Sequence, residues 1–463
     1  MLSGSSDRAA RSFLFPSIVW LLLGSTALLF AEAKLVSPGL LDVKAFTYPR
    51  LAAIASVSFQ FGWLTLAGLA AIYYVLPRIT GAPMRGETAG VAAGIIINIC
   101  VLLGITLIMF GGSQGLQWAE LPTYLIAPIV FALLLVASAV FRTIGARTEG
   151  DLYVSARFFG GAAIWGPLGL AAGHLNPFRD VPDSVAHLFS VNSTLLLWFS
   201  AIGVGALLYV VPRAAGSPLY SNRLANIGFW MFAIAAPLAG ASRQIFGPSP
   251  AWLQTISVAA SIALLAPVVA VVVNTFATVG DGWRKLDDNP SLRFFIAGTV
   301  VWALGVGVGV LQSMRSVARA VGLSEVSTMQ IWLIIFGVSL WFMGLIVFCL
   351  PRLLGKRWVG SDRLTAHLWT TLTGIAVLVG SGLASALATQ SAIHGGAVAG
   401  TPISFGDGFL GASSGDRMLR LSGLAGALLI VVGQWIFLRN TMRATTSGEP
   451  RPVEVVLGDE AVA

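Results

Sequence analysis

Long apolar stretches, separated by short polar or charged segments, run along almost the whole chain. Each is long enough for an α-helix to cross the hydrocarbon core of a bilayer, which takes roughly 20 residues. The stretches predict membrane-spanning helices at 13–33, 50–76, 88–110, 120–142, 152–174, 184–212, 224–247, 252–279, 291–320, 325–351, 364–391 and 420–440. We therefore expect a single twelve-helix membrane domain at 1–443, followed by a flexible cytoplasmic tail at 444–463.

The composition agrees with this pattern. Hydrophobic residues make up 56% of the 463 positions and charged residues only 10%, whereas soluble proteins carry about 25% charge. No polar segment is long enough for a soluble domain, and the largest predicted loop, 390–418, is rich in Gly and Ser. Cys100 and Cys349 both fall inside predicted helices, where we expect small core residues and no disulfide.

The charges predict how the helices are oriented. About 19 of the 28 lysines and arginines fall in loops on the side of the N-terminus. By the positive-inside rule, this asymmetry places both the N- and the C-terminus in the cytoplasm, as an even number of spans requires. The net charge of +8 is explained by this topology, so no nucleic-acid partner is expected.

Three predicted helices end on the cytoplasmic side in the same way, with proline followed by arginine. The three endings are Leu76-Pro77-Arg78, Val211-Pro212-Arg213 and Leu350-Pro351-Arg352. Proline ends a helix well, and arginine anchors at the lipid headgroups. They belong to the second, sixth and tenth spans, so the spacing is compatible with a threefold pseudo-repeat of four helices, although a shared cytoplasmic stop signal would also explain it.

Tryptophan and arginine positions give further expectations about depth. Trp118 and Trp252 are typical of an interfacial aromatic belt, whereas Trp198, Trp302 and Trp332 lie deeper and need another reason. Acidic residues are almost absent from the spans, and the clearest ionisable group within them is Arg243, near the outer end of 224–247. Arg243 is either a snorkelling headgroup anchor or an anchor for an anionic group or a partner subunit.

Histidine is scarce for a chain of this length. The four are His174, His187, His367 and His394, and they are spread over both predicted surfaces. A bis-histidine haem needs two histidines that face each other at one depth, and a copper ion beside a second haem needs several more. Only His187 begins a span at a suitable depth. We expect an ordinary surface or interface role for each of the four.

Several segments between Thr47 and Arg443 are specific enough to suggest a family. They are Tyr48-Pro49-Arg50-Leu51, Tyr209-Val210-Val211-Pro212-Arg213, Pro218-Leu219-Tyr220-Ser221-Asn222-Arg223-Leu224, Leu264-Leu265-Ala266-Pro267, Gly282-Trp283-Arg284-Lys285-Leu286, Pro290-Ser291-Leu292-Arg293-Phe294 and Asn440-Thr441-Met442-Arg443. In order and spacing they resemble segments of subunit I of the cbb-type haem-copper (cytochrome c) oxidases. The resemblance implies an all-α integral membrane fold, a haem-copper-oxidase-like bundle of twelve helices in a prokaryotic cytoplasmic (inner) membrane.

The residues at the family's ligand positions depart from its pattern. The haem and copper histidines fall at Ala55, Asn192 (or Val191, if the correspondence shifts by one residue), Ser242, Arg243, Gln330 and Trp332. The tyrosine that cross-links to a copper ligand falls at Trp302, and a glutamate near the active site falls at Val308. The resemblance implies haem b and copper, but their ligands are absent. The sequence therefore predicts no catalytic, cofactor-binding or metal-binding residue.

The physical character of these positions is consistent with a lost cofactor layer. In the predicted topology they lie toward the outer ends of helices that run in alternating directions. Trp302 and Trp332 are large enough to fill part of an empty haem pocket, where a void would be costly. Asn192 and Gln330 can hydrogen-bond between helices, for roughly 1 kcal/mol.

Three functions remain open from the sequence. The first is a non-catalytic relative of oxidase subunit I, a membrane subunit or scaffold of a respiratory or electron-transfer complex in which other membrane or cytochrome subunits carry the metals. The second is a divergent cytochrome c oxidase or nitric oxide reductase that binds haem through unusual ligands, such as His187, Met329 or Met343. The third is a transporter or a quinone- or lipid-binding protein, with Gln60 and Gln244 among its candidate cavity residues, together with Gln312 and Gln330.

Overall fold

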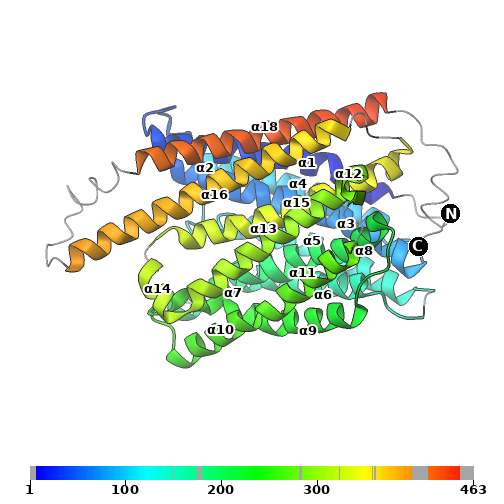
Figure 1. Cartoon of the computed structure of the whole chain (residues 1–463), viewed down its shortest axis with the longest axis horizontal. Helices are drawn as coiled ribbons and strands as arrows, with labels where there is room; N and C mark the ends of the chain where they lie inside the picture. Colours follow the sequence, from blue (N-terminus) through cyan, green and yellow to red (C-terminus); the bar gives the residue numbers. More distant parts are fainter. Residues whose placement is uncertain are drawn as a thin grey trace.

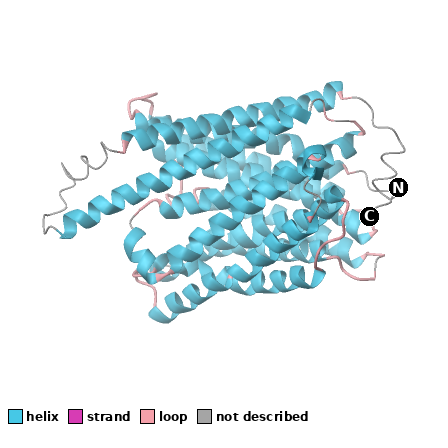
Figure 2. Cartoon of the chain, viewed as in Figure 1, coloured by secondary structure: helices cyan, strands magenta, loops and turns pink. Residues whose placement is uncertain are grey.

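The computed structural model describes residues 7–148, 150–174, 180–280, 284–322, 324–356, 358, 361–398 and 416–448. This part of the chain is almost entirely helical, as Figure 2 shows. The long helices run side by side along one elongated bundle (Figure 1). The architecture is thus the all-α one that the apolar stretches predict.

The structure gives the following helix bounds. The α-helices are α1 (Arg8–Val36), α2 (Tyr48–Val57), α3 (Thr65–Thr80), α4 (Glu87–Met109), α5 (Thr123–Gly145), α6 (Val154–His174), α7 (Asp180–Ser193), α8 (Ala201–Ala215), α9 (Asn222–Ala239), α10 (Ala251–Ala263), α11 (Leu265–Val279), α12 (Lys285–Asp288), α13 (Pro290–Ser313), α14 (Arg315–Val321), α15 (Val326–Leu354), α16 (Ser361–Val398) and α18 (Arg417–Ser447). Shorter turns are η1 (Lys44–Phe46) and η4 (Gly240–Gln244), and the π-helical segments η2 (Ser58–Leu64) and η3 (Thr194–Ser200) join α2 to α3 and α7 to α8.

Eleven helices in the described part of the chain are long and apolar enough to span a membrane. The remaining predicted span, 152–174, corresponds to α6, which has 21 residues and packs against α5, α7 and α8. Its length suffices for a bilayer, but it is less apolar because it is rich in glycine and contains Arg157. The guanidinium of Arg157 donates to Asn226 Oδ1 at 2.6 Å on α9, so the charge is held within the bundle.

Three of these spans have no face left open to lipid: 48–80 (α2–η2–α3), 180–215 (α7–η3–α8) and 326–354 (α15). We call them the central helices. In each, the most apolar window is fully buried inside the bundle, while the other spans bury between 33% and 56% of theirs. The central helices are the same three that carry proline and arginine near their ends, so burial recurs with the same period of four spans. The expectation that proline ends them was wrong, because each helix continues two residues past the arginine and ends before a left-handed glycine.

The three endings also share one side-chain geometry. Arg78, Arg213 and Arg352 each lie over the aromatic ring four residues earlier, with the guanidinium carbon 3.8, 3.8 and 3.7 Å from the ring centroid. Each guanidinium also donates to the backbone carbonyl of that aromatic residue. Each charge is thus bonded to the preceding turn of its own helix, near the end of that helix.

Three expectations need correction. Trp118 does not belong to an interfacial belt, because its indole is buried and packs inside the bundle, whereas Trp252 is exposed as expected. His367 has no surface role, since it is fully buried and stacks on Phe437 with ring centroids 4.7 Å apart. Helix α16 continues to Val398, into the segment expected to be a loop, and the side chain of His394 lies outside the described residues.

Two smaller expectations concern the C-terminal helix and the cysteines. Helix α18 runs to Ser447, slightly beyond the predicted limit of the membrane domain at Arg443. Cys100 and Cys349 are both buried free thiols, as their positions inside apolar helices predicted.

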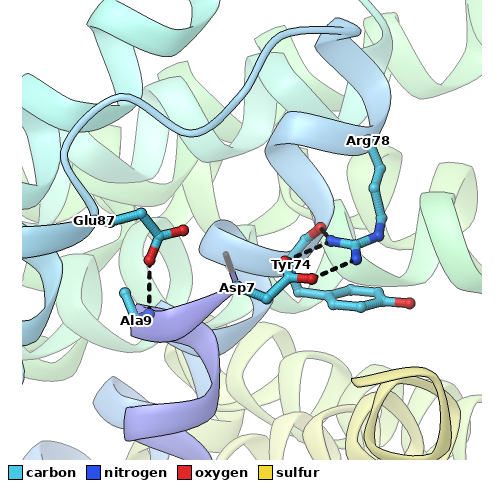
Figure 3. A network of polar contacts seen from close by, with 5 residues as sticks. All are labelled: Asp7, Ala9, Tyr74, Arg78 and Glu87. Atoms are coloured by element: carbon cyan, nitrogen blue, oxygen red, sulfur yellow. Dashed lines mark hydrogen bonds and ion pairs between the residues drawn. The ribbon is translucent and has the colours of Figure 1, made fainter. Parts of the chain in front are cut away.

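The start of α1 is tied to the first central helix by the ion pair in Figure 3. The carboxylate of Asp7 accepts two hydrogen bonds from the guanidinium of Arg78, at 3.0 and 2.8 Å. Beside it, the backbone N–H of Ala9 donates to the carboxylate of Glu87 at 2.7 Å. Negative charge at a helix N-terminus is favourable, so these contacts stabilise the start of α1 and hold it against α3 and α4.

We predict that Asp7→Asn lowers the free energy of unfolding by about 1–2 kcal/mol, because the charge-assisted, bidentate contact to Arg78 becomes a neutral one. The measurement is the apparent melting temperature in detergent. The matched control is Asp287→Asn, whose 91% exposed carboxylate pairs with Arg293 at 3.6 Å and should contribute little. Equal shifts in the two variants would contradict the assigned role of Asp7.

Candidate functional site

Four of the predicted ligand positions lie around one cavity of about 100 Å³. It is formed where η4, at the end of α9, meets α7, α13 and α15. The four side chains are those of Asn192, Ser242, Arg243 and Gln330. The structure brings these four positions together, and we call the space they line the small cavity.

The small cavity has a polar wall whose members are hydrogen-bonded to the bundle. The guanidinium of Arg243 donates to Gln330 Oε1 at 2.7 Å, which links η4 to α15. Asn192 Nδ2 donates to the carbonyl of Ala236 at 2.5 Å, and Ser242 Oγ donates to that of Ala239 at 2.7 Å. Arg243 thus bonds inward to a buried amide, and the snorkelling interpretation is not supported.

Trp332 belongs to a second cavity, although it is only two residues from Gln330. This large cavity, of about 500 Å³, lies between α1, α2, α15, α16, α18 and the loop before α5. Its wall combines apolar residues with Glu32, Glu120, Arg50 and Arg420. The two positions of the family's His-x-His pattern therefore face two separate spaces.

An aromatic cluster closes one side of the large cavity. The ring of Trp332 lies 5.4 Å from Trp118, 5.2 Å from Phe59 and 5.3 Å from Phe336, measured between centroids. Ala55, one turn before Phe59, is fully buried but does not line either cavity. Trp332 therefore fills space beside α2, as its size predicted, while the methyl group of Ala55 is covered by neighbouring helices.

Trp302 lies apart from both cavities, in the interior of the bundle. Its indole N–H donates to Ser200 Oγ at 3.0 Å, and its ring centroid lies 5.2 Å from that of Trp341. A Cβ added at Gly337 would lie 2.6 Å from the Cβ of Trp302, so the glycine makes room for this bulk. Trp302 is a fully buried packing residue with its one polar atom satisfied.

A polar chain that sequence reasoning missed leads from the central helices to the large cavity. Gln60 Nε2 donates to Ser56 Oγ at 2.9 Å, and Ser56 Oγ donates to Glu120 Oε2 at 2.8 Å. The other carboxylate oxygen of Glu120 accepts from the backbone N–H of Trp118 at 2.8 Å. Trp118 has φ +68°, and this left-handed turn folds the loop back against the helices. Hydrophobic periodicity carries no signal for such a loop.

The described histidines do not converge on either cavity. His174 Nδ1 lies 3.1 Å from the carbonyl of Leu170 within α6. His367, on α16, lies between the rings of Phe294 and Phe437. His187 lies on α7 and lines neither cavity. Within the described ranges, no group of three or more His, Cys, Asp or Glu side chains is arranged to hold a metal ion.

The side chains at the predicted ligand positions do not fit haem b or copper. Ala55 has no donor atom, and the indole nitrogen of Trp332 is a hydrogen-bond donor only. Asn192 and Ser242 use their polar hydrogens on backbone carbonyls, and a guanidinium has no lone pair for a metal. Histidine, cysteine, methionine and tyrosine are the usual protein ligands of haem iron, and none of them stands at these positions.

Fold and site together define a multi-pass membrane protein of the oxidase large-subunit type. Residues 8–394 match the family described as cytochrome C and quinol oxidase polypeptide I, and the chain belongs to this family. The suspected resemblance is thereby confirmed at the level of the family. The protein is a multi-pass protein of the prokaryotic cytoplasmic membrane.

Individual relatives show how far the similarity extends. The chain is 24% identical to the cbb3-type cytochrome c oxidase subunit CcoN1 of Stutzerimonas stutzeri, over 96% of each protein. It is 25% identical to cytochrome c oxidase subunit 1 of Rhodobacter capsulatus, over 69% of this chain and 63% of that protein. A heme-copper terminal oxidase solved by cryo-EM has the same fold, with a TM-score of 0.75, 13% identity, and coverage of 96% of this chain and 85% of that chain.

Glu120 should make stability depend on pH. Burial raises the pKa of its carboxyl from an ordinary 4.5 to about 7. The folded chain then holds a proton that the unfolded chain releases, so stability is highest below pH 4.5 and decreases as the pH rises toward 7. We predict that the free energy of unfolding of the wild type falls by up to about 3 kcal/mol across this pH window. In the Glu120→Gln variant this fall should be absent.

The measurement is the apparent melting temperature in detergent between pH 5 and pH 8. The amide side chain of the Glu120→Gln variant can keep the contacts to Ser56 and Trp118, so the variant tests the proton and not the loop. Asp42→Asn, at an exposed position in the loop before α2, is the control and should keep the wild-type slope. An unchanged slope in Glu120→Gln would show that another group titrates.

Proposed function

We propose that this protein is a non-catalytic member of its family, a membrane subunit or scaffold of a respiratory or electron-transfer complex. Partner proteins would bind the haem and metal groups, and this chain would contribute the helical bundle against which they assemble. Its relatives are named as oxidase subunits, which supports a role within a larger membrane complex.

The observation that carries the proposal is the contact between Arg243 and Gln330, at 2.7 Å. These residues stand where the resemblance places a copper ligand and a haem ligand. A guanidinium stays protonated in proteins and offers no acceptor atom, so Arg243 cannot coordinate copper. Its positive charge also opposes the approach of a metal cation to the same wall.

The alternative ligands do not support a divergent oxidase or nitric oxide reductase. Met329 and Met343 lie on the same helix, 14 residues and therefore about 21 Å apart, so they cannot serve one iron. The sulfur of Met329 lies against Gly382 on α16, where an added Cβ would come within 2.4 Å of it. His187 lines neither cavity.

We predict that the chain, purified by itself after expression with ample haem, shows no stoichiometric Soret band and no stoichiometric copper by elemental analysis. The reason is that neither cavity offers imidazole to a metal. In contrast, the protein isolated from native membranes in mild detergent should bring with it partner subunits that carry haem.

A His187→Ala variant provides the control for adventitious haem. Any residual absorption should be the same in the wild type and in this variant. One haem per chain in the wild type, lost in His187→Ala, would overturn the non-catalytic proposal and favour the oxidase alternative.

The large cavity favours a second function, the binding of a quinone or lipid. Its volume of about 500 Å³ falls within the range typical of small-molecule sites. Trp118 and Trp332 provide an apolar aromatic wall, while Tyr48, Glu120 and Arg420 provide polar groups. This combination suits an amphipathic molecule with a ring or headgroup and an apolar chain.

We predict that organic extraction of the purified protein, followed by mass spectrometry, yields one bound quinone or lipid per chain. Ser385→Phe should abolish this because the ring would occupy the cavity that Ser385 lines. Leu387→Phe, at a position 53% exposed, is the matched control and should retain the ligand. Equal ligand content in both variants would place the molecule elsewhere.

A further inference from the structure

The small cavity contains one positive charge, and the hydroxyl hydrogens of its serines are already donated to other groups of the bundle. Among its lining residues are Arg243, three amide side chains (Asn192, Gln312 and Gln330) and four serines, and none of the lining residues is acidic. A cavity with this wall presents a positive potential to anything inside it.

The charge of Arg243 is not balanced by a carboxylate within the described ranges. The ion pairs between described residues join Arg78 to Asp7, Arg293 to Asp287 and Arg420 to Asp416, so none includes Arg243. Arginine does not give up its proton, and a charge in a membrane bundle is costly unless it is paired. The amide oxygen of Gln330 relieves only part of this cost.

Two amide groups are held with their donors available. Gln312 Oε1 accepts from Ser327 Oγ at 2.7 Å, and Gln312 Nε2 is buried without a hydrogen-bond partner. Gln330 Oε1 accepts from Arg243, which leaves Nε2 as its donor. Nε2 of Gln330 lies next to Gly309, where an added Cβ would be 3.0 Å away. A buried donor without a partner is unfavourable and calls for an acceptor.

The helix beside the cavity adds to the positive field. Helix α14 follows α13 and contributes Ala318 and Val321 to the wall. It carries Arg315, which donates to Thr255 Oγ1 at 3.3 Å, and Arg319, which lies 5.9 Å from the ring centroid of Phe246. Figure 1 places α14 at one end of the bundle, so an ion could reach the cavity from the adjoining aqueous side.

We propose that the small cavity binds one small monovalent inorganic anion, a halide or a planar oxyanion such as nitrate. The single uncompensated guanidinium sets the charge at minus one. The volume of about 100 Å³, against about 30 Å³ for each water in the liquid, admits such an ion and excludes a nucleotide or a phospholipid headgroup. The anion accepts charge-assisted hydrogen bonds from Arg243 and neutral ones from the amides.

This proposal rests on the proposed function only in requiring that no metal occupies the small cavity. The two can fail separately. Absorption and elemental analysis test for the metals, and anion titration tests for the ion. If the protein binds neither metals nor anions, the anion proposal fails and the subunit proposal stands.

The experiment is a titration of the purified protein with sodium nitrate or sodium chloride, with gluconate holding the ionic strength constant. Isothermal titration calorimetry or the apparent melting temperature reports binding. The wild type should show a saturable response, and Arg243→Gln should weaken binding at least about tenfold, since it removes the charge and keeps an amide donor. Arg243→Lys should retain measurable affinity.

Two further variants keep the test decisive. Arg319→Gln lowers the net charge equally but lies outside the cavity lining, so it should weaken binding much less than Arg243→Gln does. Gln312→Leu removes the unpartnered donor and should weaken binding even if Arg243→Gln does not fold. A wild type that does not saturate, or an Arg243→Gln variant with wild-type affinity, would overturn the proposal.

Discussion

The structure depends on close packing among three helices that have no lipid-facing side. Within this core, large side chains of one helix fill the space left by glycines of the next. A Cβ added at Gly203 would lie 2.5 Å from the ring of Trp341, and one at Gly68 would lie 3.3 Å from Ile202 and 3.4 Å from the ring of Phe342. Neither water nor lipid reaches these positions, so polar atoms must find partners inside the bundle. Trp63 does so by donating to Ser339 Oγ at 2.8 Å.

The same constraint applies to the proposed loss of metal ligands in this chain. A bundle that loses a buried cofactor must fill the void and satisfy the groups that once faced it, because voids and unpaired polar groups are both costly. Trp302 and Trp332 contribute volume, and the Arg243–Gln330 contact joins two elements through a hydrogen bond. Space remains beside the Arg243–Gln330 contact, in the small cavity, and beside Trp332, in the large one.

The sequence predicted the helices well because every membrane span needs about 20 apolar residues, whichever helices it packs against. It also placed the recurring endings near proline and arginine, although each helix ends before a left-handed glycine. It could not predict Glu120 or Trp118, whose loop turns inward through a left-handed residue and owes its place to tertiary contacts. It placed Gln330 and Trp332 in one layer, but could not show that they serve two cavities.

That separation follows from helix geometry. Residues two apart on an α-helix point about 200° from each other, so Gln330 and Trp332 face opposite sides of α15. On one side, Gln330 accepts a hydrogen bond from Arg243 in the small cavity, and on the other, Trp332 packs against Phe59 beside the large one. One buried helix therefore forms part of the wall of both cavities, and a substitution at either position changes one wall without touching the other.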